Sequence, residues 1–79
     1  MSQWKIAWFT EGSDGVLRLH DDPAYFDDHD GAKKLMKTIV REIEGNPRLH
    51  SKRQVVKMYY GRVMTDSYES RPLKNARKY

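Results

Sequence analysis

Large apolar residues alternate with other residues in two short stretches near the beginning of the chain. In residues 3–9 every second position holds a large apolar side chain: Trp4, Ile6 and Trp8. The same period of two returns over residues 16–20, and residues 11–15 between the two stretches contain two glycines, which tolerate positive φ. Two alternating stretches joined by a short glycine-containing loop predict a β-hairpin.

Apolar residues next recur at intervals of three and four positions: Ala32, Leu35, Met36, Ile39, Val40 and Ile43. This spacing predicts an amphipathic helix over residues 32–43. We expect Asp28 or Asp30 to cap the start of this helix. Gly45 is expected to end it in a left-handed conformation, with Pro47 just beyond.

Residues 54–60 are rich in β-branched and aromatic side chains, which are typical of a strand. A turn or bulge at residues 61–62 is expected to follow, and residues 63–68 then continue as strand. Because short apolar runs are ambiguous by periodicity, a second helix capped by Ser51 is an alternative for residues 54–60.

Together these elements predict an α+β fold: an antiparallel sheet of three to four strands with one helix across one face, in the order ββαβ(β). Residues 21–30 are expected to be a polar connector and residues 47–51 a loop. A single domain is expected over residues 1–69, with a basic, flexible tail at residues 70–79. The strands carry large residues on both faces, and one helix covers only one of them. The second face is therefore expected to be a dimer contact, a partner surface or an exposed aromatic face.

Length and composition exclude several classes of protein. At 79 residues the chain has room for one domain, and the lack of cysteine excludes disulfides, thiolate zinc sites and cysteine nucleophiles. The longest apolar run covers only residues 6–9, so neither a membrane span nor a signal peptide is expected. We therefore expect a cytoplasmic protein.

The net charge of +4 results from two oppositely charged parts of the chain. Residues 11–30 hold seven acidic groups and one basic group, a net charge of −6. Residues 33–79 hold thirteen basic and four acidic groups, a net charge of +9. This division is compatible with ordinary solvated surface, and it also predicts a dipolar surface that steers a charged partner.

No residue pattern indicates catalysis or a cofactor. Residues 27–30 are metal-ligand types, but they lack the ligand spacing of a calcium loop, and capping of the following helix accounts for them. The three histidines lie in separate segments, and a chain this short has little room for an enclosed active site. We expect no metal, no cofactor and no enzymatic activity.

Two sets of residues are candidates for binding a protein or nucleoprotein partner. The first is acidic and imitates a row of phosphates: Asp21, Asp22, Asp27, Asp28 and Asp30. The second is an aromatic and basic anchor: Tyr59, Tyr60 and Arg62. A protein that binds in this way is expected to be a monomer or a homodimer.

An overlapping basic and aromatic set predicts a different function: Lys52, Arg53, Lys57, Tyr59 and Tyr60. Cations that contact phosphates, interleaved with rings that stack on bases, are what single-stranded DNA or RNA requires. The alternative is therefore a small basic protein that binds single-stranded nucleic acid.

As a whole the sequence resembles the small inhibitor proteins encoded by phages and mobile elements, above all the anti-CRISPR group. The shared features are its length, the lack of cysteine, a hairpin at residues 4–20, one amphipathic helix, a strand region at residues 55–68, and no catalytic constellation. The resemblance implies an inhibitor that binds a CRISPR effector subunit, or another nucleic-acid machine, in the host cytoplasm and prevents target binding or nuclease recruitment. Many such inhibitors are acidic, whereas this chain has a pI near 9.5. A local acidic patch or an aromatic and basic face would therefore make the contact.

Overall fold

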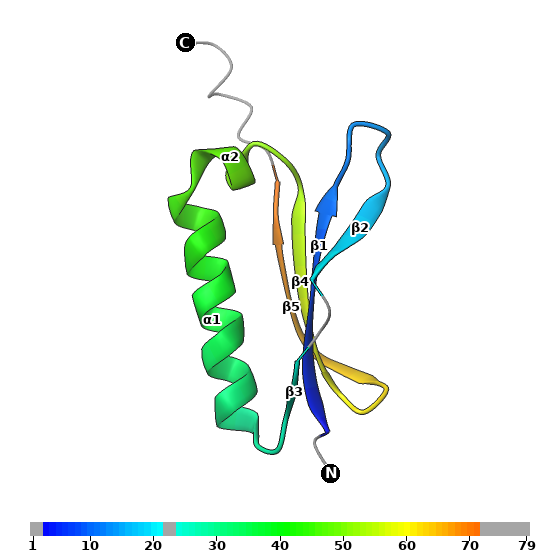
Figure 1. Cartoon of the computed structure of the whole chain (residues 1–79), viewed down its shortest axis with the longest axis vertical. Helices are drawn as coiled ribbons and strands as arrows, with labels where there is room; N and C mark the ends of the chain where they lie inside the picture. The colour runs from blue at the N-terminus through cyan, green and yellow to red at the C-terminus, as the bar shows by residue number, and fades with distance from the viewer. Residues whose placement is uncertain (1–2, 22–23, 72–79) are drawn as a thin grey trace.

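Five strands form one antiparallel sheet, and a 17-residue helix lies along one side of it (Figure 1). The computed structural model describes residues 3–21 and 24–71. Its elements are, in chain order, β1 (Trp4–Glu11), β2 (Leu17–Asp21), β3 (Tyr25–Phe26), α1 (His29–Gly45), α2 (Pro47–His50), β4 (Gln54–Tyr60) and β5 (Val63–Ser70). The strands are ordered β2-β1-β4-β5, and β3 pairs with the first residues of β1. Most of the tail expected at residues 70–79 lies outside the described residues, and Ser70 is the last residue of β5.

The α+β class and the predicted first hairpin are confirmed, and of the turn or bulge expected at residues 61–62 the structure has a turn. β1 and β2 pair around a turn in which Gly15 has a φ of 80°. β4 and β5 pair around a turn that begins at Gly61, which has a φ of 62°. The alternative of a second helix over residues 54–60 is wrong, because every residue of β4 is paired with a residue of β1.

Two short elements occupy segments that were not expected to be regular. β3 lies within the expected connector and pairs with Trp4 and Lys5, so the sheet has five strands and the order of elements is β-β-β-α-β-β, with α2 as an additional short helix. That short helix replaces the expected loop, and Pro47 at its start has the fixed φ and missing N–H that suit the first turn of a helix. With two and four residues, these elements are too short to produce a periodic pattern.

The predicted start of α1 is confirmed, and its predicted end is wrong. Asp28 caps the helix, because its Oδ1 accepts a hydrogen bond from the Gly31 N–H at 3.0 Å. Gly45 has no positive φ and is the last residue of the helix. Asn46 ends α1 instead through its extended backbone, and its side chain accepts a hydrogen bond from the Arg48 N–H at 3.0 Å. One residue therefore ends the first helix and caps the second.

The hydrophobic core lies between α1 and the two central strands. Its buried side chains come from α1, β1 and β4: Ile6, Ala32, Met36, Ile39, Ile43, Val56 and Met58. Trp4, Trp8 and Tyr68 are partly buried and pack against this cluster. Because side chains alternate along a strand, the core uses only every second residue of β1 and β4.

A buried amide connects α2 to the sheet. Gln54 is fully buried, and its Oε1 accepts hydrogen bonds from Trp8 Nε1 and Thr10 Oγ1, each at 2.8 Å. Its Nε2 donates to the Leu49 carbonyl in α2 at 2.9 Å. The side chain thus uses both ends of its amide, and the short helix is held against the first residue of β4.

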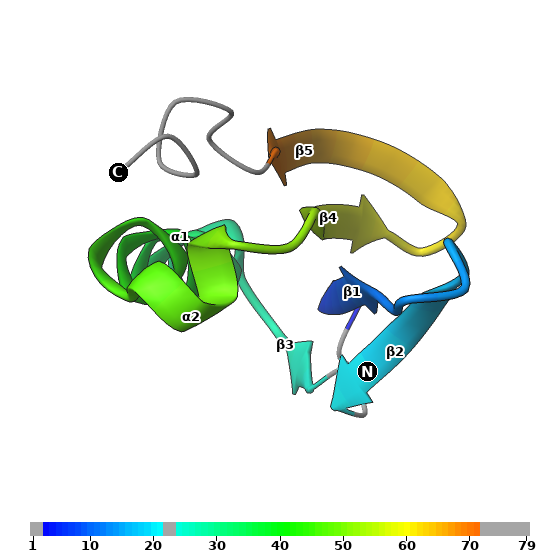
Figure 2. The ribbon, with the colours of Figure 1, turned by 90° about the horizontal axis from the view of Figure 1, so that it is seen from above.

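Both helices lie on one side of the sheet, as Figure 2 shows from above. The turns of the two hairpins bend away from α1, so the sheet curves toward its other side (Figure 1). Among the described residues, no helix or strand covers that other side. This uncovered surface is where a functional site has to be sought.

Candidate functional site

The side of the sheet opposite α1 presents a continuous surface, which we call the open face. Strand pairing places its members opposite one another: Lys5 opposite Tyr59, Ala7 opposite Lys57, Phe9 opposite Val55 and Leu19, Lys5 opposite Tyr25, and Tyr59 opposite Met64. The open face consists of Lys5, Ala7, Phe9, Glu11, Leu17, Leu19, Tyr25, Arg53, Val55, Lys57, Tyr59, Met64, Ser67 and Glu69. All five strands contribute to it.

Two lysines and two aromatic rings form the centre of the open face. The Lys5 Nζ lies 5.6 Å from the centre of the Tyr59 ring, and the Lys57 Nζ lies 5.9 Å from the centre of the Phe9 ring. All four side chains are partly exposed and belong to the central strands β1 and β4. The arrangement therefore brings two positive charges directly over two π-faces.

Apolar side chains surround this centre and remain exposed. Tyr25 is 62% exposed, Met64 is 51% exposed and Leu19 is 44% exposed. They come from three different strands, β3, β5 and β2. A small protein that needed only solubility would place polar residues at these positions, so this border is a candidate contact surface.

An ion pair neutralises the third cation of the open face. Arg53 Nε donates to Glu69 Oε2 at 2.6 Å, and Arg71 lies 3.0 Å from the same carboxylate oxygen. The hydrogen bond from Arg53 lowers the pKa of Glu69, and the same bond raises the pKa of Arg53. The charge of Lys57 also lowers the pKa of Glu69, so this one carboxylate interacts with Arg53, Arg71 and Lys57, and the open face keeps a net positive charge.

The basic and aromatic set predicted from the sequence is divided by the sheet. Arg53, Lys57 and Tyr59 share the open face. Tyr60 is the next residue of the same strand, so it faces the other side, where its ring lies 4.6 Å from that of Trp4. Lys52 is exposed in the segment between α2 and β4.

The predicted anchor of Tyr59, Tyr60 and Arg62 is divided in the same way. Its two tyrosines point to opposite faces of β4. Arg62 is exposed in the turn between β4 and β5. The three side chains therefore do not form one compact anchor.

The predicted acidic set lies on two different elements. Asp27, Asp28 and Asp30 surround the start of α1, and the Asp28 carboxylate is used to cap that helix. The Asp30 side chain is 91% exposed and lies 3.9 Å from the His29 ring nitrogen Nδ1. Asp21 ends β2, where it is paired with Trp8, and Asp22 lies outside the described residues.

Several residues of the open face were missed by the sequence analysis. Lys5, Phe9 and Tyr25 lie far along the chain from Lys57 and Tyr59, and only strand pairing brings them together. The alternation of residues 3–9 did contain a signal, because it placed Lys5 and Phe9 on the side opposite the tryptophans. It did not contain the register that puts Lys5 beside Tyr59.

Residues 3–21 and 24–71 contain neither a group of metal ligands nor a helix that could cross a membrane. No three His, Asp or Glu side chains are grouped there in a way that could hold a metal ion. Neither helix in that part of the chain has the length and apolar character needed to cross a membrane.

Comparison with known proteins does not assign the chain to a family. No protein-family model matches it, and no curated protein or solved structure matches it significantly. Its function is therefore inferred from the placement of its own side chains.

Proposed function

We propose that this chain is a non-catalytic binding protein whose open face binds single-stranded nucleic acid. The observation that carries the proposal is the pairing of two lysines with two aromatic rings at the centre of an uncovered sheet. Proteins that bind single strands combine cations that contact the backbone with rings on which bases stack. The net charge of +4 adds a long-range attraction to a polyanion.

Each of the two rings gains more free energy from a stacked base than from the lysine that lies over it. A lysine over an exposed ring contributes about 0.5–1 kcal/mol, whereas a stacked base contributes about 1–3 kcal/mol. A base can therefore replace the lysine over Tyr59, and the displaced ammonium group can then contact a neighbouring phosphate. The same exchange is available at Phe9 with Lys57.

A fluorescence anisotropy titration with labelled single-stranded DNA and RNA, repeated over a series of salt concentrations, tests the proposal. We expect single strands to bind more tightly than duplexes of the same length, because the bases of a duplex are not available for stacking. For single strands each phosphate contact contributes about −0.7 to the slope of log K against log salt. Replacing both Lys5 and Lys57 by glutamine should therefore make the slope less steep by about 1.4.

Two adjacent tyrosines give a matched pair of variants. Tyr59→Ala removes a ring from the open face, and Tyr60→Ala removes a ring from the opposite face. The first should weaken single-strand binding by about 5- to 150-fold, which corresponds to the loss of one stacked base. The second should leave binding unchanged if circular dichroism shows that both variants are folded. Equal losses, or no binding by the unmodified protein at low salt, would rule the proposal out.

A second candidate is the inhibitor predicted from the sequence, which binds a protein or nucleoprotein complex such as a CRISPR effector. The exposed apolar border of the open face favours it, because Tyr and Met are enriched in protein interfaces. In this case Tyr25→Ser and Met64→Ser should each abolish inhibition in an effector cleavage assay. Oligonucleotides should bind weakly, and equally weakly, to the unmodified protein and to both variants.

The acidic set needs a different variant for the same assay. Asp28 must be kept because it caps α1, so the informative change is Asp27→Lys with Asp30→Lys. If the acidic set makes the contact, this change abolishes inhibition. If the open face binds nucleic acid, the same change strengthens oligonucleotide binding.

A further inference from the structure

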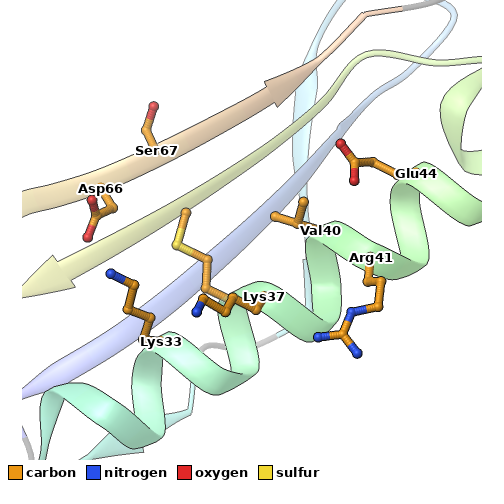
Figure 3. A pocket seen from close by; sticks show the side chains of 8 residues that line it. Lys33, Lys37, Val40, Arg41, Glu44, Asp66 and Ser67 are labelled. Atoms are coloured by element: carbon orange, nitrogen blue, oxygen red, sulfur yellow. The ribbon is translucent and has the colours of Figure 1, made fainter.

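A groove of about 380 Å³ separates α1 from β5, on the side of the sheet that α1 covers (Figure 3). The buried residues of α1 pack against core residues of β1 and β4, and Tyr68 is the residue of β5 that packs against this core. The groove lies beside these contacts. Met36 and Val40 provide its apolar lining on the helix side. The groove thus has a helix as one wall and the outermost strand of the sheet as the other.

Three cations follow the helix wall of this groove. Lys33, Lys37 and Arg41 are spaced four residues apart, so they lie on one side of α1. Within residues 3–21 and 24–71 no ion pair involves any of them. Like charges at this spacing destabilise a helix by about 0.2–0.5 kcal/mol per pair, and an anionic partner relieves that repulsion.

The charged side chains that line the groove point in different directions, as Figure 3 shows. Lys33 points from α1 toward Asp66 on β5, whereas the Arg41 guanidinium is turned outward from the strands. Glu44 lies further along the groove and accepts a hydrogen bond from the Tyr68 hydroxyl at 3.3 Å. Two carboxylates therefore belong to the groove, and they make it unfavourable for a continuous polyphosphate.

The strand wall offers a free backbone edge. Among the residues that the structure describes, β5 pairs with β4 only, so its outer N–H and C=O groups have no strand partner there. A shift of register beside Met58 leaves Thr65 without a paired residue in β4, and its Oγ1 donates to the Met58 carbonyl at 3.3 Å; such a bulge bends a strand. The regular part of the edge is then residues 66–70, and Asp66 and Ser67 at its beginning line the groove.

Side chains repeat along the helix wall at nearly the same distance as along an added strand. Side chains on one face of a strand repeat at about 6.7 Å, and residues four apart on a helix repeat at about 6 Å. A strand placed beside β5 would therefore present every second side chain to Lys33 and Lys37 in turn, with Arg41 at the end of the same row. Backbone hydrogen bonds to the edge would supply affinity, and the cations would select acidic residues at alternate positions.

We propose that this groove binds an extended acidic segment of another protein as an additional strand on the edge of β5. The occupant has acidic side chains at alternate positions, two of which face Lys33 and Lys37. This site lies on the other side of the sheet from the open face, and it does not depend on the function proposed for that face.

The test is a titration with a labelled eight-residue peptide, Thr-Glu-Val-Glu-Val-Glu-Val-Thr. The control peptide has the same composition with its three glutamates adjacent, Thr-Val-Glu-Glu-Glu-Val-Val-Thr. We expect the alternating peptide to bind at least about tenfold more tightly. Amide resonances of residues 66–70 should shift in the presence of the alternating peptide, whereas those of the open face should not. Equal binding of the two peptides overturns the proposal.

Two variants of α1 complete the test. Lys37→Glu reverses a charge in the groove, and Lys34→Glu makes the same change at an exposed position outside its lining. The first should weaken peptide binding by about tenfold or more and the second should have little effect. Equal effects indicate attraction by net charge alone, and overturn the proposal. A shift of the amide resonances of residues 66–70 on addition of an oligonucleotide also overturns the proposal. So does a change of these resonances with protein concentration in the absence of peptide, because it indicates that a second copy of the chain binds there.

Discussion

The two faces of β4 show how one strand serves two purposes. Toward α1, Val56 and Met58 are completely buried. Between and beside them, Lys57 and Tyr59 remain partly exposed on the open face. The buried polar side chains of the covered face, Gln54 and Ser70, lie at one end of the sheet, whereas the open face combines rings, lysines and an ion pair at its centre.

This difference separates the residues that maintain the fold from those available for binding. Burial of apolar surface against α1 supplies most of the stability, at roughly 25 cal/mol for each Å² removed from water. The exposed rings of the open face gain little from folding, because they stay in contact with water. Their presence is better explained by contact with a partner, and the following substitutions test how sharply the two faces are separated.

The largest effect is expected from neighbouring residues of β4. Met58→Ala should destabilise the protein by about 2–5 kcal/mol, because it leaves a cavity beneath α1. Lys57→Ala, one residue away on the open face, should change the stability by no more than about 0.5 kcal/mol. Urea unfolding followed by tryptophan fluorescence measures both. Similar losses for the two variants would mean that the open face is also part of the core.

A smaller loss of stability is expected from substituting Gln54, the buried polar residue of β4 on the covered face. Gln54→Leu keeps most of the volume but leaves Trp8 Nε1–H, the Thr10 hydroxyl and the Leu49 carbonyl without their partner. Unsatisfied buried groups cost about 1–3 kcal/mol. The indole N–H resonance of Trp8 should move while that of Trp4 stays in place. An unchanged Trp8 resonance, with full stability, would show that this hydrogen bond contributes nothing to the fold.

The covered face was much easier to predict from the sequence than the open face. The apolar side of α1 is a local pattern, since Ala32, Met36, Ile39 and Ile43 repeat with the period of a helix. The start of the helix was also local, because the Asp28 side chain bonds to a backbone N–H only three residues away. Such features depend on neighbours in the chain, and these are visible in the sequence.

The open face depends on pairing between distant segments. Lys5 lies over Tyr59 only because β1 and β4 pair in one particular register, and no local pattern specifies that register. β3 was missed for the same reason, since its two residues become a strand only by pairing with β1. Asp28 belongs both to the predicted cap and to the predicted acidic set, and its carboxylate accepts a hydrogen bond from the helix that it starts.

The smallest effect on stability is expected at the ion pair of the open face. The pKa of Glu69 is lowered from its ordinary value of 4.5 by the hydrogen bond from Arg53. The pair therefore stabilises the fold fully above pH 4.5, and this contribution is lost as the pH falls through the lowered pKa of the folded state. Both side chains are 30% exposed, so solvent screens the interaction and the change in unfolding midpoint should be slight.

The same pair should nevertheless have a clear effect on binding, which sharpens the distinction between the two faces. Glu69→Gln removes the carboxylate that holds Arg53 and also contacts Arg71, so the Arg53 guanidinium on the open face becomes available to a phosphate. Single-strand binding should tighten, and the slope of log K against log salt should become steeper by about 0.7. Glu42→Gln changes the net charge equally at an exposed position of α1, and it should leave the slope unchanged. If both variants tighten binding to the same extent, the open face contributes only its net charge, and the stacking of bases on its rings has to be abandoned.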